Sequence, residues 1–121
     1  MKIKLKGTIK DLTNNEVTSF ETTAIKTKNN YKYIIDNEKY ILNVIDNKKI
    51  VLVRSTHEFE NTMYFEKNKK IPSLYTLKSN NITLEIDILT TSLEIEENRI
   101  KILYRVIASN NDYEYNIEMS E

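Results

Sequence analysis

The chain has 121 residues, of which 40% are hydrophobic and 30% charged, a balance typical of one folded domain. Its formal net charge is zero, which argues against a general binder of nucleic acids or anionic membranes. The absence of cysteine excludes disulfides and thiolate metal sites. No apolar run approaches the ~20 residues that cross a bilayer. We therefore expect a single cytoplasmic domain over residues 1–121, with no membrane and no nucleic-acid partner.

A period of two dominates the chain from its first segment onward. Lysines alternate with apolar residues over 2–11, and similar alternation recurs to the end. Such alternation places the two sets of side chains on opposite faces of a strand, and no run has the apolar spacing of a stable helix. The pattern predicts strands at roughly 2–11, 16–28, 31–36, 39–46, 49–55, 60–67, 72–79, 81–95, 99–109 and 113–120.

Asparagine and aspartate mark the turns, because the chain has one glycine, Gly7, and one proline, Pro72. Both residue types tolerate left-handed backbone angles. Turns are expected at residues 14–15, 29–30, 36–37, 46–47, 80–81, 97–98 and 110–112. The run 81–95 is longer than an average strand, and a bend near Leu89–Thr91 would let it serve two sides of a barrel.

The distribution of charge favours a closed sheet. The first 54 residues carry eleven basic and six acidic residues, whereas the remaining 67 carry seven and twelve. Lys2, Lys4 and Lys6 share one face of the first strand, and Glu114 and Glu118 share one face of the last. Pairing these strands would oppose unlike charges, at roughly 0.2–1 kcal/mol a pair, and would remove exposed edges. We predict an all-β, closed or nearly closed antiparallel β-barrel of about 8–10 strands with little or no helix.

Five stretches carry a pattern that resembles a known family. They are Lys49–Ser55, Met63-Tyr64-Phe65, Tyr75-Thr76, the run Leu84–Thr90 and Ile100–Tyr104. Together they are similar to the YwiB-like family of small bacterial proteins. Where that family tends to have glycine, this chain has Thr56 and Asn80-Asn81, so we expect different turn geometry there. The resemblance implies a calycin-type (lipocalin-like) barrel and implies no activity.

His57 is the only histidine and lies near the end of a predicted strand. A serine–histidine–acid triad would need a serine and a carboxylate beside it in space. An exposed loop histidine is the simpler interpretation. One histidine without cysteine leaves none of the usual zinc sets, and no calcium-loop spacing is present. We predict no catalytic residue, no metal and no cofactor, and a hydrolase using His57 is the third of three hypotheses.

Arg54 shares strand parity with Ile50 and Leu52, while valines occupy the other face. We expect it to point into largely apolar space, where a guanidinium needs an acidic partner. The candidate partners are Glu58, Glu66 and Asp87. Arg54 is either an anion-binding group in a barrel cavity or half of a structural ion pair.

Eight tyrosines stand against three phenylalanines and no tryptophan. A tyrosine has an apolar body and a polar tip, which suits a pocket for an amphipathic ligand. Ordinary strand packing is the alternative, since strands are rich in aromatic residues. Lysines 48–49 and 67–70 would suit phosphates, although a solvated hairpin tip explains them equally.

Two functions remain open. The first hypothesis is a noncatalytic barrel that binds a small amphipathic or anionic ligand in its interior or mouth, with Arg54, Tyr75 and Tyr104 as polar contacts. It predicts a cavity of at least a few hundred Å³. The second is a structural or protein-interaction module that presents an outer face or rim to a partner or to a second copy in a homodimer. Leu103 and Ile107 favour it, because they lie on the presumed outer face of a strand.

Overall fold

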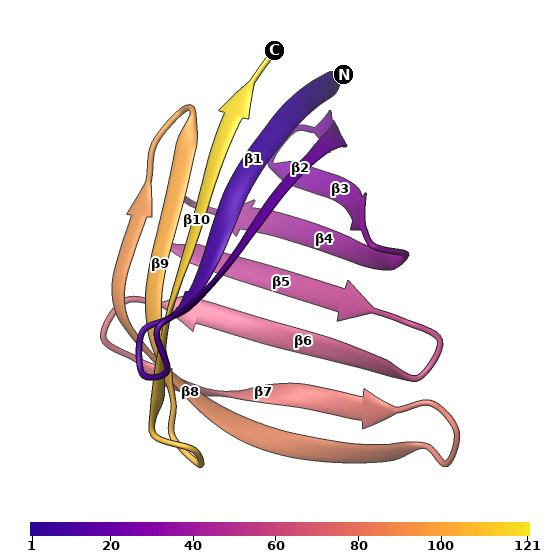
Figure 1. The fold of residues 1–121 in the computed structure, drawn as a ribbon, viewed down its shortest axis with the longest axis vertical. Coiled ribbons are helices and arrows are strands. Elements are labelled where there is room, and N and C mark those ends of the chain that lie inside the picture. Colours follow the sequence, from indigo (N-terminus) through magenta and orange to yellow (C-terminus); the bar gives the residue numbers. More distant parts are fainter.

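The computed structural model describes all 121 residues and consists of ten strands with no helix. The strands are β1 (Lys2–Asp11), β2 (Glu16–Thr27), β3 (Asn30–Ile35), β4 (Glu38–Ile45), β5 (Lys49–Ser55), β6 (Phe59–Glu66), β7 (Lys70–Leu77), β8 (Ile82–Ile95), β9 (Arg99–Val106) and β10 (Asn111–Ser120). Each strand pairs antiparallel with the next, and β10 returns to pair with β1 (Figure 1). The predicted closed antiparallel barrel is confirmed, with strand ends shifted by a few residues. No helix that could span a membrane is found.

Asparagine takes the role that glycine usually has in the turns. Nine residues other than glycine have a positive φ, and six of them are asparagines. Asn37 and Asn47, with φ angles of 66° and 54°, close the β3–β4 and β4–β5 hairpins at predicted positions. Asn68, in the β6–β7 turn, also has a positive φ and lies between the strands predicted at 60–67 and 72–79.

The closure of the barrel follows the predicted pairing of unlike charges. In the β1–β10 ladder Lys6 lies opposite Glu118, and Lys10 lies opposite Glu114. Lys10 Nζ lies 3.6 Å from a Glu114 carboxylate oxygen. The ammonium of Lys6 lies nearer Glu21 on β2, at 3.9 Å. The charges therefore join β1 to both of its neighbours.

Strand β8 serves two sides of the barrel, as its length predicts. Residues 82–89 pair with β7 and residues 88–95 pair with β9. The register shifts between Thr90 and Ser92, which is the expected bend. Thr90 is fully buried there.

The interior of the barrel on the side of the termini is filled by side chains. Eighteen buried hydrophobic residues form one core. Leu5, Leu42, Ile100 and Ile117 surround a space there with no room for a water molecule. A deep ligand cavity in this part of the interior is therefore excluded, and open space lies at the two ends of the barrel, with a shallow hollow of about 330 Å³ at the end that holds the termini.

The β2–β3 ladder is the shortest in the barrel. It has three residue pairs, from Thr27↔Asn30 to Ile25↔Lys32. Beyond them the strands separate, and the Thr22 hydroxyl donates a hydrogen bond of 2.9 Å to the carbonyl of Ile34. The barrel thus has an open seam between β2 and β3, toward the end away from the termini.

Candidate functional site

Four polar or aromatic side chains form a row across neighbouring strands at this open end. The ladders place Tyr40 opposite Arg54, Arg54 opposite Asn61, and Asn61 opposite Tyr75. Each lies on the inward face, because Arg54 has the parity of buried Leu52 on its own strand. We call Tyr40, Arg54, Asn61 and Tyr75 the mouth row.

Arg54 forms a two-pronged ion pair with Glu38 on β4. Its Nε and Nη2 each donate to a different Glu38 carboxylate oxygen, both at 2.8 Å. Tyr40 donates its hydroxyl to the same carboxylate at 2.9 Å. Arg54 Nη1 bonds to no protein acceptor, so part of the guanidinium is available to a ligand.

The partners of Arg54 expected from the sequence were wrong. Glu58, Glu66 and Asp87 do not bind it, and Glu38 does. The reason is the register of the β4–β5 hairpin, which places Tyr40 opposite Arg54 and Glu38 diagonally across on the same face.

The ion pair sets the protonation of its neighbours. The hydrogen bond from Arg54 is the main cause that holds the pKa of Glu38 below its ordinary value. The same contact raises the pKa of Arg54. Burial, followed by the hydrogen bond to Glu38, raises the pKa of Tyr40 to about 12. At neutral pH the mouth row therefore has one guanidinium, which is paired with the Glu38 carboxylate, beside the neutral hydroxyl of Tyr40.

Phe59 links two of the predicted site residues. The guanidinium of Arg54 lies 5.2 Å from the centroid of the Phe59 ring, and the Tyr75 ring stacks on it at 4.9 Å. A cation over an aromatic face and a stacked ring pair are both favourable contacts. Arg54, Phe59 and Tyr75 thus form one continuous surface at the mouth.

Tyr104 lies deeper, on β9. Its ring is 5.4 Å from Tyr113 and 5.0 Å from Phe65, and its side chain is buried. Burial raises its pKa, while the positive charge of Arg54 lowers it by a smaller amount. Its hydroxyl has no hydrogen-bond partner in the protein. The three residues predicted as ligand contacts therefore face the same end of the barrel.

The open space at the mouth is a cleft of about 570 Å³. It lies at the β2–β3 seam, and Arg54, Glu38 and Tyr40 are among its walls. Apolar surface comes from Ile9 and Phe20. Six of its eleven lining residues are polar or charged, among them the carboxylates Glu21, Asp36 and Glu38 and the guanidinium of Arg54. A concave space that combines apolar surface with convergent polar groups is typical of a small-molecule site.

Stacked rings separate the cleft from the filled core. Tyr33 stacks on Tyr40 at 5.2 Å and on Phe20 at 6.5 Å. The hydroxyls of Tyr33 and Tyr115 are 3.0 Å apart and share a buried hydrogen bond. Tyr33 and Tyr115 therefore pack in the barrel interior. Ordinary strand packing was the alternative interpretation of the tyrosines in the sequence analysis.

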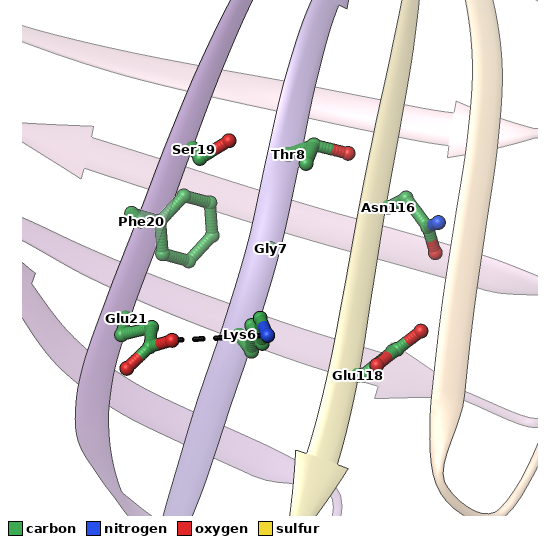
Figure 2. Close-up of a pocket in the computed structure, with 8 residues that line it drawn as sticks. All are labelled: Lys6, Gly7, Thr8, Ser19, Phe20, Glu21, Asn116 and Glu118. Carbon is green, nitrogen blue, oxygen red and sulfur yellow. Dashed lines mark ion pairs between the residues drawn. The ribbon is translucent and has the colours of Figure 1, made fainter.

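A second hollow, of about 260 Å³, lies on the outer surface around Gly7 (Figure 2). Its polar lining comes from β1, β2 and β10, with Glu21, Asn116 and Glu118 among the residues drawn. The Asn116 Oδ1 atom is buried without a hydrogen-bond partner. The Phe20 ring lies beside Gly7 (Figure 2), so the hollow and the mouth cleft share this ring.

His57 lies exposed in the β5–β6 turn. It forms no hydrogen bond or ion pair with a serine or a carboxylate. The nearby turn is held instead by the Thr56 hydroxyl, which accepts hydrogen bonds from the amides of Glu58 and Phe59. The arrangement that a His57 hydrolase requires is absent.

Comparison with known proteins finds a likeness in fold. No family model matches the chain, and the curated proteins contain no match. The crystal structure of the YwiB protein from Bacillus subtilis superposes with a TM-score of 0.69 and 19% identity, over 98% of this chain and 89% of that one. The likeness supports the YwiB-like fold expected from the strand patterns, and at this identity it concerns the fold alone.

Sequence reasoning missed Glu38, Phe59 and Asn61. The signal for Glu38 was present: a hairpin turn centred on Asn47 places Tyr40 opposite Arg54. No comparable signal identified Phe59, because its contacts depend on how two adjacent hairpins curve around the mouth.

Proposed function

We propose that this barrel is a noncatalytic binding protein that takes a small, partly apolar ligand at its mouth. The observation that carries the proposal is the 570 Å³ cleft whose wall includes the Arg54–Glu38 pair. Its volume falls within the roughly 300–1,000 Å³ of small-molecule sites. Arg54, Tyr75 and Tyr104 are the proposed polar contacts; Arg54 lines the cleft, whereas Tyr75 and Tyr104 lie outside its lining at the same end of the barrel.

The chemistry of the mouth suggests the class of ligand. Glu38 already neutralises Arg54, and Glu21 and Asp36 add two further carboxylates to the wall of the cleft, so a ligand with several negative charges would be repelled. One carboxylate or a neutral oxygen acceptor suits the unbonded Nη1 of Arg54. A planar apolar body suits the surface made by Phe59 and Tyr75. We therefore propose an amphipathic ligand with a single acceptor or anionic group.

The wider setting is part of the same proposal. The strand patterns and the fold of the Bacillus subtilis YwiB protein support membership of the YwiB-like family, in a bacterial protein with a calycin-type barrel. The absence of cysteine is compatible with a cytoplasmic location.

Native mass spectrometry of protein purified from its own host tests this function. We expect a small organic molecule bound to the wild-type barrel and lost from Arg54→Gln. Arg105→Gln is the matched control, because Arg105 forms a similar two-pronged pair with Asp112 on the outer surface. An adduct that Arg54→Gln retains as strongly as the control would contradict binding at the mouth.

The second candidate is a protein-interaction module, and one hairpin favours it. Residues 82–87 of β8 have no partner on β9, which begins to pair at Ile88. Ile82 and Leu84 lie there, with exposed fractions of 47% and 48%. Such a free edge with apolar side chains is suited to contact with a partner or a second copy.

Light scattering over a range of concentrations distinguishes this candidate. A homodimer through the hairpin predicts a mass that doubles with concentration and returns to monomer in the double variant Ile82→Ser/Leu84→Ser. A monomer at every concentration would count against the homodimer. Ile107, which favoured this hypothesis in the sequence, is 38% exposed, whereas Leu103 is partly covered.

A further inference from the structure

We propose a second binding site, for a compact oligophosphate anion, at the barrel end that lies opposite the mouth. It is a hollow of about 480 Å³ between the β4–β5 and β6–β7 turns. We call it the lysine hollow. It is lined by Asn47, Lys48, Lys49, Glu66, Lys67, Lys69 and Leu93.

Strand pairing brings the two lysine groups together. Lys49 at the start of β5 lies opposite Glu66 at the end of β6. The β4–β5 turn, which precedes β5, and the β6–β7 turn, which follows β6, therefore lie side by side. The sequence alone shows two separate lysine groups near positions 48 and 67. In the fold, lysines of both groups line one hollow. Two separate solvated hairpin tips would not predict this arrangement.

Glu66 fixes two of the ammonium groups. Its two carboxylate oxygens lie 3.2 Å from Lys49 Nζ and 2.5 Å from Lys69 Nζ. The Glu66 side chain is 15% exposed, so it lies beneath the lysines rather than among them. Lys69 and then Lys49 lower the pKa of Glu66, which keeps it ionised and the two lysines in place.

The hollow keeps a positive charge after this pairing. Four lysines line it against one carboxylate, and neither Lys48 nor Lys67 forms an ion pair. On the adjacent β8–β9 hairpin, Arg99 binds Glu94 at 3.2 Å and Glu96 at 3.7 Å. Glu97 of that turn and Asp46 of the β4–β5 turn form no ion pair, and neither lines the lysine hollow. The excess of positive charge is therefore confined to the lining of the hollow.

These features select the class of ligand. Ammonium groups bind phosphate as compact point charges and do not demand the planar geometry that arginine gives. Several such groups around one concave space favour an anion with several charges close together. A tripolyphosphate chain, free or as part of a nucleoside triphosphate, has that charge density. The proposed site is independent of the mouth and of its ligand.

Titration with inorganic tripolyphosphate, followed by ¹H–¹⁵N NMR at low salt, tests the site. We expect saturable shifts confined to the amides near Lys48, Lys67 and their turns. The variant Lys48→Gln/Lys67→Gln should bind at least about tenfold more weakly. Because these two side chains form no ion pair or hydrogen bond, we expect the variant to fold.

A matched control removes the same charge elsewhere. Lys2 and Lys4 lie on the outer face of β1 and also form no side-chain ion pair. Lys2→Gln/Lys4→Gln should bind within about twofold of the wild type. Equal weakening by both double variants, or shifts spread over the whole surface, would overturn the site in favour of general charge attraction.

Further titrations define the source of the phosphate. Adenosine triphosphate bound as tightly as tripolyphosphate indicates that the phosphate chain alone is recognised, and tighter binding with shifts at Leu93 indicates a nucleotide. Sulfate bound as tightly as tripolyphosphate would contradict an oligophosphate site. Mouth variants such as Arg54→Gln should leave these results unchanged.

Discussion

The fold leaves no room for a side chain at Gly7. A Cβ atom at this position would overlap Phe20 Cζ and lie 2.7 Å from Cε1 of the same ring and 2.9 Å from the backbone oxygen of Asn116. Gly7→Ala should therefore lower the free energy of unfolding by about 1–3 kcal/mol, the usual cost of overpacking. Urea unfolding measures the change.

A second substitution shows whether the ring is the cause. Phe20→Leu removes the ring atoms that the new Cβ would meet, so Gly7→Ala should cost less in the Phe20→Leu background than in the wild type. An equal cost in both backgrounds would place the strain at the backbone of Asn116 instead.

Glu38 should make the stability of the barrel depend on pH. Its pKa in the folded protein lies below the ordinary 4.5, chiefly because Arg54 donates to it. The stabilisation is therefore present above about pH 4.5 and is lost as the pH falls through the folded pKa. At pH 7, Glu38→Gln should be less stable than the wild type by about 1 kcal/mol, a value reduced for partial exposure.

Unfolding curves at several pH values measure this difference. The gap between wild type and Glu38→Gln should stay constant from pH 8 to pH 6 and shrink below about pH 4. The Asp112→Asn variant, which breaks an exposed pair with Arg105, provides a comparison with a smaller expected change. A gap that persists unchanged at pH 3 would rule out the ion pair as its source.

At the scale of single residues, the sequence predicted the strand face on which a side chain lies better than the residue that it contacts. Strand parity correctly turned Arg54 inward, because alternation determines the face of a strand. Parity does not determine which acid reaches Arg54, since that depends on the register of a neighbouring strand. Glu38 was therefore missed, although it is only 16 residues from Arg54 in the chain.

At the scale of elements, the β2–β3 seam should be the least protected part of the barrel. Its three residue pairs leave the backbone of residues 17–23 paired on the β1 side alone. Amides of this segment that point toward β3 should exchange with solvent quickly, and those that point toward β1 slowly. Hydrogen exchange followed by NMR should therefore show alternating protection. Uniform protection over 17–23 would contradict an open seam.

The strands were predictable and the seam was not. Alternating β-branched and apolar residues located all ten strands, and the excess length of β8 located its bend. Strand β2 alternates too, although much of it is polar on both faces, as the segment Val17-Thr18-Ser19-Phe20-Glu21 shows. Such a strand has weakly specified pairing, so its separation from β3 leaves no clear trace in the sequence.

At the scale of the molecule, a filled core lies between two open ends of the barrel. Leu5, Leu42 and Ile100 help to fill the interior on the side of the termini, which rules out a deep cavity there. The mouth holds the cleft, the ion pair and the aromatic surface. Opposite charges on the first and last strands predicted closure correctly. They carried no information about how side chains of the ten strands divide the interior.

The central claim is that the mouth is a small-molecule site, and an NMR screen with small aromatic carboxylates tests it most directly. We expect saturable shifts at the amides near Arg54, Tyr75 and Tyr104, which Arg54→Gln weakens at least about tenfold and Arg105→Gln leaves unchanged. Compounds that shift no mouth amide, or that bind Arg54→Gln as well as the wild type, would contradict the claim.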